Sequence, residues 1–333
     1  MTANLSIDEG ILSAVGRTPL VQLDRLFSRN GSSTRFFAKL EGLNPAGSVK
    51  DRAATSMVLD AIEKGTIEPG RSVVVESSSG NLGIGLAQAC CRFGVRFICV
   101  VDPKTTAQNI SILRSYGAEI DLVSEAGDAG DYLTARLRRV RELCAQLPHT
   151  YWTNQYENVL NARAQESIMR EVVGELEQRV DYIFIATGTC GTIRGCGGFI
   201  RRNALSTRIV AVDAEGSAIF GTPGRRLIPG HGAAIRPALW HEGIADQVVS
   251  VNDQDCVVGC RNLVGAEAIL AGGSSGAVVS AVEHLRDEIP DGSTCVLVLP
   301  DRGERYLDTI YSDEWVHGNF GEIKHLWKRK APC

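Results

Sequence analysis

Short apolar runs alternate along the chain with longer stretches in which apolar residues recur at helical spacing. The short runs predict strands, because a buried parallel strand is a nearly continuous apolar segment. We expect strands at residues 36–40, 72–75, 97–101, 119–123, 182–186, 209–212 and 295–299. The longer stretches predict helices. We expect them at residues 51–64, 82–93, 107–116, 132–146, 192–203, 253–270 and 277–287.

This alternation predicts an α/β fold. Repeated strand–helix–strand units need right-handed crossovers, which give a mainly parallel sheet with helices on both faces. Ligands bind such sheets beyond the carboxyl ends of the strands. Because no low-complexity linker interrupts the pattern, we expect two interleaved α/β lobes. The smaller lobe would span residues 50–155, and the larger would combine residues 1–49 with 156–333.

Composition and charge narrow the class of protein. The 333 residues are 44% hydrophobic and 22% charged, which suits a soluble globular chain with two cores. The 35 glycines, 11 prolines and 6% aromatic content favour an α/β enzyme over a β-sandwich. A net charge of -4 argues against nucleic-acid binding. A polar start and the lack of a long apolar span predict a cytoplasmic protein with no membrane contact.

The ten cysteines could in principle bind a metal ion or form disulfides. No CxxC pair occurs, and no histidine lies at a ligand-like spacing from two cysteines, so we predict no metal site. Most of these thiols should be small core residues in a reducing compartment.

The first segment with chemical potential, residues 41–52, places Lys50 where a helix begins. The positive end of the helix dipole and partial burial both disfavour a charged lysine, which prepares the amine as a nucleophile or Schiff-base former. The alternative is an ordinary solvated lysine after a loop.

The second segment, residues 73–85, is a strand that enters a serine-rich turn and then a helix. Hydroxyls, backbone amides and the helix dipole would converge there on an anion, and a carboxylate suits them. The serines could also simply cap the helix. The two interpretations are compatible.

Two further turns follow later strands. In residues 182–195, glycines together with Thr189 and Thr192 could wrap a phosphate, although a tight turn explains them equally well. Neither a Walker lysine motif nor GxGxxG is present. In residues 271–277 a serine could hydrogen-bond a heterocyclic nitrogen, or it could cap a helix.

Together, a helix-start lysine, a carboxylate cradle, a phosphate cradle and a serine are what pyridoxal 5'-phosphate requires. From residue 16 to residue 306 the chain resembles the fold-type II pyridoxal-phosphate enzymes of the cysteine synthase family, whose fold is similar to tryptophan synthase β. The motifs are specific in combination and order.

The resemblance implies a role for each motif. Lys50 would form the internal aldimine and move the α-proton, Asn81 would bind the cofactor's 3'-oxygen, and Ser274 would contact the pyridine nitrogen. The cofactor phosphate would be held by Gly188, Thr189, Cys190, Gly191 and Thr192. The substrate carboxylate would be held by hydroxyl and amide groups of Ser78, Ser79 and Leu82. A neutral serine partner would favour β-elimination through an α-aminoacrylate over transamination.

The chain departs from ordinary cysteine synthases at several positions. Leu82 ends a carboxylate loop that is usually Thr-Ser-Gly-Asn-Thr, and Cys190 lies in a phosphate loop whose centre is usually all glycine. Residues 300–303 read Pro-Asp-Arg-Gly where the family usually has Pro-Ser-Ser-Gly, so the resemblance assigns the pyridine partner to Ser274 instead. For Cys190 we favour packing over catalysis, because no histidine lies nearby in sequence to act as its base.

Residues 75–84, 132–137 and 152–158 resemble the members of the family that serve staphyloferrin B biosynthesis. That resemblance implies a homodimer that eliminates phosphate from O-phospho-L-serine and adds the amine of L-glutamate. The product would be N-(2-amino-2-carboxyethyl)-L-glutamate, a precursor of 2,3-diaminopropionate. Arg136 and Tyr156 would then be candidates for binding the substrate phosphate. Alternatively, Arg136 is a solvated helix charge and Tyr156 a packed aromatic.

Three other functions stay open. A cysteine synthase would add sulfide to the same aminoacrylate, formed from O-phosphoserine or O-acetylserine. A catalytically idle relative would bind a partner in the same cleft, and a nucleotide-binding regulator is disfavoured by the missing motifs. An acidic second substrate would need an arginine. The sequence does not rank the candidates Arg17, Arg52, Arg194, Arg225 and Arg226.

Overall fold

The computed structural model describes residues 10–28, 31–127, 132–177 and 179–327. The chain divides into two compact units. Unit 1 comprises Met1–Arg17 and Asn44–Ala164, and unit 2 comprises Thr18–Leu43 and Gln165–Cys333.

These unit boundaries differ from the predicted lobe boundaries mainly at the start of the chain. Leu12, in the 3-10 helix Ile11–Ala14, packs in the core of unit 1, although the prediction assigned it to the larger lobe. The strand Arg35–Leu40 pairs with a strand near the other end of the chain, within unit 2. The chain therefore contributes to unit 1 first, then to unit 2, then returns to unit 1, and ends in unit 2.

Unit 1 is built on a four-stranded parallel sheet in the order β5-β4-β3-β6. Its strands are β3 (Val73–Ser77), β4 (Arg96–Val101), β5 (Glu119–Leu122) and β6 (Thr150–Trp152). Its helices are α1 (Lys50–Glu63), α2 (Asn81–Phe93), α3 (Ala107–Ser115) and α4 (Tyr132–Gln146). The boundary between the units falls within α5 (Val159–Glu175).

Alternating residues of β3 face two different cores of unit 1. Val74 packs with Leu86 of α2 and Met57 of α1, whereas Val75 packs with Val140 of α4. Because both faces are covered by helices, the strand is apolar along most of its length.

Unit 2 is built on a six-stranded sheet in the order β1-β2-β10-β7-β8-β9. Its strands are β1 (Leu20–Gln22), β2 (Arg35–Leu40), β7 (Tyr182–Ala186), β8 (Arg208–Ala214), β9 (Gln247–Val251) and β10 (Thr294–Leu299). Only β1 runs antiparallel to its neighbour among these strands.

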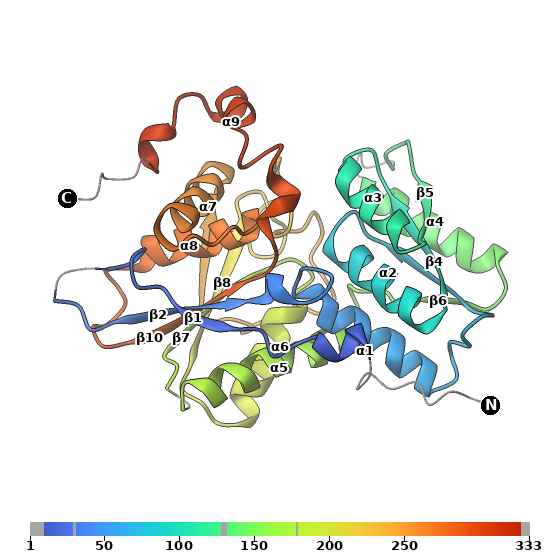
Figure 1. Ribbon diagram of the computed structural model, residues 1–333, viewed down its shortest axis with the longest axis horizontal. Helices are drawn as coiled ribbons and strands as arrows, with labels where there is room; N and C mark the ends of the chain where they lie inside the picture. Colours follow the sequence, from blue (N-terminus) through green and yellow to red (C-terminus); the bar gives the residue numbers. More distant parts are fainter. Residues whose placement is uncertain (1–9, 29–30, 128–131, 178, 328–333) are drawn as a thin grey trace. The chain divides into compact units, whose positions relative to one another are not determined.

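Helices cover both faces of the sheet in unit 2 (Figure 1). Two of them, α7 (Asp253–Glu267) and α8 (Gly273–Leu285), lie on one side, and α6 (Gly191–Arg202) lies on the other. The chain then forms the 3-10 helix Gly303–Tyr306 and the short helix α9 (Asp313–Phe320). A mainly parallel sheet with helices on both faces confirms the predicted α/β class.

Every predicted strand and helix is present, and two match their predicted bounds, β7 and α4. The predicted bounds were wrong around residues 268–276. The helix α7 ends at Glu267 because Ala268 is left-handed, and α8 begins at Gly273, four residues before the predicted start. A Cβ at Gly276 would collide with the Cys256 carbonyl, so this glycine permits close helix packing and does not mark a loop.

Among the strands and α-helices of the described residues, the sequence pattern missed β1, β6, β9, α5 and α9. The strands β1 and β6 have only three residues each, too few for a periodicity to be visible. Among the helices of the described residues, none is long and apolar enough to cross a membrane. Seven of the nine described cysteines are buried, and none of the nine is in a disulfide.

Candidate active site

The residues predicted to bind the cofactor and the substrate carboxylate lie at four helix starts, α1 and α2 in unit 1 and α6 and α8 in unit 2. At each start the N-cap residue makes no side-chain capping hydrogen bond. The first amide groups of a helix have no partner inside the helix, and they attract anions when no capping side chain occupies them. These starts therefore suit ligand binding.

Lys50 is the first residue of α1 and is half-buried, so it is not the exposed lysine of the alternative interpretation. The loop before it is closed by Asp51, whose carboxylate accepts bonds from the Ala46 amide at 2.5 Å and the Ser48 hydroxyl at 3.2 Å. The Lys50 amide donates to the same Ser48 hydroxyl at 3.2 Å. The buried Asp51 side chain thus orders the turn that presents Lys50.

The serine-rich turn follows β3 and is held on several sides. The Ser78 hydroxyl accepts bonds from the Gly83 amide at 2.9 Å and the Gly80 amide at 3.4 Å, so this serine does cap α2. The Cys99 thiol donates to the Ser78 carbonyl at 3.1 Å, and Asn109 donates to the Ser79 carbonyl at 3.0 Å. The Ser78 hydroxyl keeps its own proton to donate to a carboxylate.

Close packing brings the starts of α1 and α2 together. A Cβ at Gly85, one turn into α2, would lie 3.0 Å from the Ala54 Cβ and 3.5 Å from the Asp51 Cα. Lys50 and Asn81, the first residues of the two helices, are therefore in neighbouring turns of unit 1.

Leu82 is 2% exposed and packs in the core beside α1 and α2. Its side chain therefore faces the protein interior, and only its amide could bind a substrate. This agrees with the backbone role that the resemblance implies, which stays a prediction.

Arg136 is buried on α4, so its interpretation as a solvated helix charge is wrong. Its Nε lies 3.1 Å from a carboxylate oxygen of Asp102, which is itself buried just after β4. A substrate phosphate at Arg136 would share the guanidinium with this carboxylate. Tyr156, in the turn between β6 and α5, is half-buried and so is not a fully packed core aromatic.

The predicted phosphate loop lies between β7 and α6 in unit 2. Cys190 is left-handed with φ of 62°, and α6 begins at the next residue with no acidic side chain in its first turn. Successive amides in such a bend form a concave site for anions. Thr189 and Thr192 add hydroxyl groups and are 8% and 7% exposed. These donors fit a phosphate group.

Asp213 anchors the beginning of this loop. The Thr187 hydroxyl donates to its carboxylate at 3.1 Å, and the Phe220 amide donates to it at 3.3 Å. Burial raises the pKa of this carboxyl group. The Gly232 amide donates to the Thr187 carbonyl at 2.6 Å, which ties a second loop to the same place.

Ser274, in the first turn of α8, is 1% exposed. Its hydroxyl has no hydrogen-bond partner among the described residues. Gly230 links it to the phosphate loop, because a Cβ there would lie 3.4 Å from the Ser274 Oγ, while the Gly230 carbonyl lies 3.7 Å from the Cβ position of Gly188. A neutral hydroxyl without a protein partner fits a heteroaromatic nitrogen. The donors of unit 2 thus fit pyridoxal phosphate.

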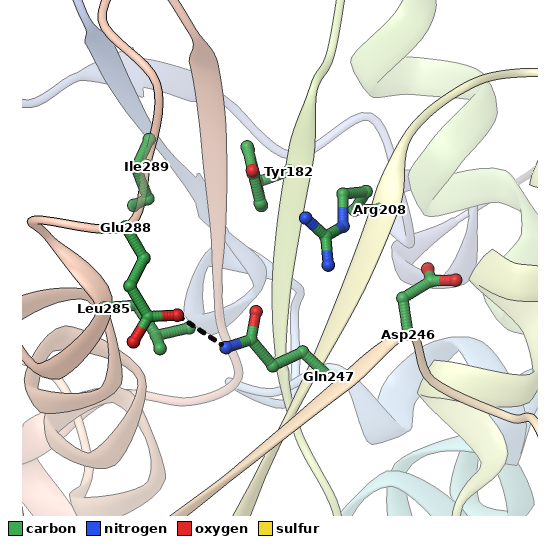
Figure 2. A pocket seen from close by; sticks show the side chains of 7 residues that line it. All are labelled: Tyr182, Arg208, Asp246, Gln247, Leu285, Glu288 and Ile289. Atoms are coloured by element: carbon green, nitrogen blue, oxygen red, sulfur yellow. Dashed lines mark hydrogen bonds between the residues drawn. The ribbon is translucent and has the colours of Figure 1, made fainter.

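A separate pocket of about 180 Å³ lies at the opposite edge of the unit 2 sheet, where β7, β8 and β9 begin (Figure 2). In this view Gln247 points toward Glu288 and donates to it at 3.2 Å. The lining is completed by Tyr182, Arg208, Asp246, Leu285 and Ile289. No predicted site residue lines this pocket.

A profile of the family described as pyridoxal-phosphate dependent enzyme matches residues 11–301. The chain belongs to this family, its fold is that of the fold-type II members, and its cofactor is pyridoxal phosphate. Over 312 residues it is 45% identical to N-(2-amino-2-carboxyethyl)-L-glutamate synthase of Ralstonia nicotianae, which covers 93% of this chain and 91% of the relative.

Solved structures give the same picture of the fold. O-acetylserine dependent cystathionine β-synthase from Helicobacter pylori matches with a TM-score of 0.85 and 28% identity, covering 92% of this chain and all of that one. Cysteine synthase from Entamoeba histolytica matches with a TM-score of 0.84 and 31% identity, covering 93% of each chain.

Sequence reasoning missed the carboxyl groups that support the site. Asp51 and Asp213 were not singled out, and neither was Glu76 of β3, which is fully buried. A signal was present for Glu76, because an acidic residue follows three valines in an apolar strand. A buried carboxyl group needs hydrogen-bond partners, and its position predicts a network.

Proposed function

We propose that this protein is a pyridoxal-phosphate dependent β-replacement enzyme that joins O-phospho-L-serine and L-glutamate. The products would be N-(2-amino-2-carboxyethyl)-L-glutamate and phosphate. The observation that carries this proposal is the 45% identity, over 93% of the chain, to a synthase of that product. The helix-start lysine and both anion-binding helix starts fit such an enzyme.

In unit 1, the Lys50 amine would hold the cofactor and then move the proton of the substrate Cα. The Ser78 hydroxyl and the amides at the start of α2 would bind the substrate carboxylate. Ser79 lies on the same turn. Asn81 would bind the cofactor's 3'-oxygen. These donors orient the amino acid so that its Cα–H bond is presented to the lysine.

In unit 2, the amides from Gly188 to Thr192 would hold the cofactor phosphate, and the Ser274 hydroxyl would bind the pyridine nitrogen. When bound, pyridoxal phosphate supplies an electron sink for the carbon that loses its proton. Because a serine is neutral and does not force protonation of that nitrogen, the arrangement favours loss of a β-substituent over transamination.

The substrate phosphate would be bound by Arg136 and Tyr156. A guanidinium can bind a phosphoryl group through two parallel hydrogen bonds. The ion pair with Asp102, at 3.1 Å, would hold the Arg136 side chain in one orientation before the substrate arrives.

The main rival is a cysteine synthase that uses sulfide as the nucleophile, and the similarity to the Entamoeba cysteine synthase favours it. The two functions share the first half-reaction and differ in the second substrate. We further propose that the enzyme acts in the cytoplasm as a homodimer and supplies a 2,3-diaminopropionate precursor for a siderophore. Light scattering coupled to gel filtration would test the dimer.

One experiment separates the two reactions. The absorbance of the bound cofactor is recorded after adding O-phospho-L-serine, and then after adding L-glutamate or sulfide in separate cuvettes. We expect a red shift that L-glutamate reverses, with the condensed amino acid detected by mass spectrometry. Reversal by sulfide alone, with cysteine as the product, would identify a cysteine synthase. No spectral change with O-phospho-L-serine would contradict the proposed function and leave only a cysteine synthase that starts from O-acetylserine.

A further inference from the structure

Glu76 is a buried carboxyl group of unit 1 to which the proposed reaction gives no role. It lies in β3, one residue before the strand ends, and is 0% exposed. Burial raises its pKa, and no described lysine, arginine or histidine forms an ion pair with it. A buried acid without a cation is costly unless hydrogen bonds satisfy it.

Four donors converge on this carboxyl group. Its Oε1 accepts bonds from the Ser77 amide at 2.8 Å and the Trp152 indole N–H at 3.4 Å. Its Oε2 accepts bonds from the Thr153 hydroxyl at 2.6 Å and the Gln155 amide at 3.2 Å. A carboxylate only accepts hydrogen bonds, so a carboxylate matches all four donors.

These donors come from two segments that are far apart in the sequence. Ser77 opens the serine-rich turn, whereas Gln155 directly precedes Tyr156. A further bond closes a ring between the segments, because the Gln155 side-chain amide donates to the Ser77 carbonyl at 3.2 Å. The neighbouring strands β3 and β6 carry the two segments, with Val75 paired to Trp152. Glu76 therefore sits at the junction of two segments that bear predicted substrate contacts.

The Tyr156 segment is also held from the chain that follows it. Asn158 donates to the Thr153 carbonyl at 2.9 Å, and Asn161 of α5 donates to the Gln155 carbonyl at 2.8 Å. The backbone of this turn is therefore fixed on one side by residues 158 and 161. Glu76 and the Gln155 side chain connect its other side to the serine-rich turn.

We propose that Glu76 is a positioning residue that locks residues 77–80 and 153–156 into one arrangement and so aligns the contacts for the first amino-acid substrate. The proposal rests on the proposed function for the identity of that substrate. Pre-aligned donors lower the cost of ordering a bound ligand, so loss of the link should weaken substrate binding more than the chemical step.

The direct test is Glu76→Gln. Glutamine keeps the size of the side chain but replaces one acceptor oxygen with an NH2 group. This group would point at donors that now bond to the carboxylate, so the hydrogen bonds to that position would be lost. In hydrogen–deuterium exchange of the purified holoenzyme, amides in both 77–83 and 153–158 should exchange about tenfold faster or more. The KM for O-phospho-L-serine should rise about tenfold, while the KM for L-glutamate changes less than about twofold.

Gln88→Met is the matched control. Gln88 is a buried amide of α2 in the same unit, and it donates to the Tyr116 hydroxyl at 3.3 Å, outside the Glu76 network. Its replacement should leave exchange in both segments and both KM values unchanged. Should Glu76→Gln fail to fold, Thr153→Val removes only one donor to Glu76 and should produce the same pattern with a smaller amplitude.

Unchanged exchange in the two segments, or faster exchange in only one of them, would overturn the proposal. An equal rise in both KM values would also overturn it, since it would indicate general loosening of the fold. The exchange measurement does not depend on the reaction. If the parent protein fails to consume O-phospho-L-serine and L-glutamate while Glu76→Gln loosens both segments together, the proposed function falls and the link stands.

Discussion

Two groups of helix starts in this protein differ in how their first amides are satisfied. The helices α3, α7 and α9 begin with capping side chains, in which Thr106, Asn252 and Ser312 accept bonds from amides three residues on, at 3.2, 2.9 and 3.2 Å. The helices α1, α2, α6 and α8 begin with Val49, Gly80, Cys190 and Gly272, which make no such bond.

The difference separates structural helix starts from candidate binding ones. A capping side chain contributes about 1 kcal/mol of stability by occupying amides that would otherwise lack a partner. The four starts without capping side chains at the N-cap are those that carry the residues implied for cofactor and substrate. At α1 and α2 a serine that lies before the N-cap, Ser48 or Ser78, still accepts a bond from one amide of the first turn, so the group is distinguished by its N-cap residues alone.

The largest expected effect comes from Lys50→Ala at the start of α1. The variant should lose the absorbance of covalently held cofactor and about a thousandfold or more of its turnover, because the amine that moves the substrate proton is gone. Lys64→Ala is the control at the other end of the same helix, where the lysine is exposed and pairs with Asp60 at 2.8 Å. The Lys64→Ala variant should keep both the cofactor absorbance and the turnover of the wild type. A Lys50→Ala protein with an unchanged spectrum would contradict the assignment.

A second prediction concerns His231, which connects the two groups of helices in unit 2. Its Nε2 lies 3.6 Å from the Cys256 thiol in the first turn of α7, while the neighbouring Gly230 lies against Ser274 of α8. Burial lowers the pKa of His231 to about 4, with Asp253 opposing the shift and Arg226 adding to it.

Because the unfolded chain binds a proton near pH 6.5 that His231 in the folded protein does not bind, stability should fall as the pH falls from about 6.5 to about 4. The expected loss from this group is about 2 kcal/mol between pH 7 and pH 5. Urea unfolding of wild type and His231→Gln at the two pH values measures it. Equal pH dependence in both proteins would show that His231 titrates normally.

A pair of serine variants contrasts the two groups directly. Ser312→Ala removes a cap, so it should cost about 1 kcal/mol of unfolding free energy and leave turnover unchanged. Ser274→Ala removes a hydroxyl that has no partner among the described residues, so stability should hardly change while turnover falls about tenfold. Denaturant unfolding and steady-state rates distinguish them. If both substitutions lowered the unfolding free energy and neither lowered turnover, the distinction between structural and ligand-binding helix starts would be wrong.

The smallest effect is expected for Cys190→Gly. Glycine relieves the left-handed strain at φ of 62° but also removes a buried side chain, and the two contributions should nearly cancel, within about 1 kcal/mol. Turnover should stay within about twofold of the wild type if Cys190 only packs. An inactive variant that still binds cofactor would instead assign the thiol a chemical role.

How much of the site was predictable depends on the range of the interactions involved. Lys50 at a helix start, the serine-rich turn and the glycine-rich loop were predicted because strand, turn and helix signals are local in sequence. The early start of α8 was missed because Gly273 and Gly276 look like loop residues until their packing is seen, Gly273 against Ile228 and Ile310 and Gly276 against α7. The ion pair of Arg136 with Asp102 joins two segments that are far apart in the sequence, which no local pattern reveals.

The sequence by itself determined the order of most strands and helices, the α/β class and the positions of the candidate donors. These follow from apolar periodicity and from turn residues, which act over a few neighbouring positions. Tertiary structure decided which unit each segment joins, which helix starts are brought together, and how Glu76, Asp51 and Asp213 support the site. Those outcomes depend on burial and hydrogen bonds between distant segments, and such contacts exist only once the chain has folded.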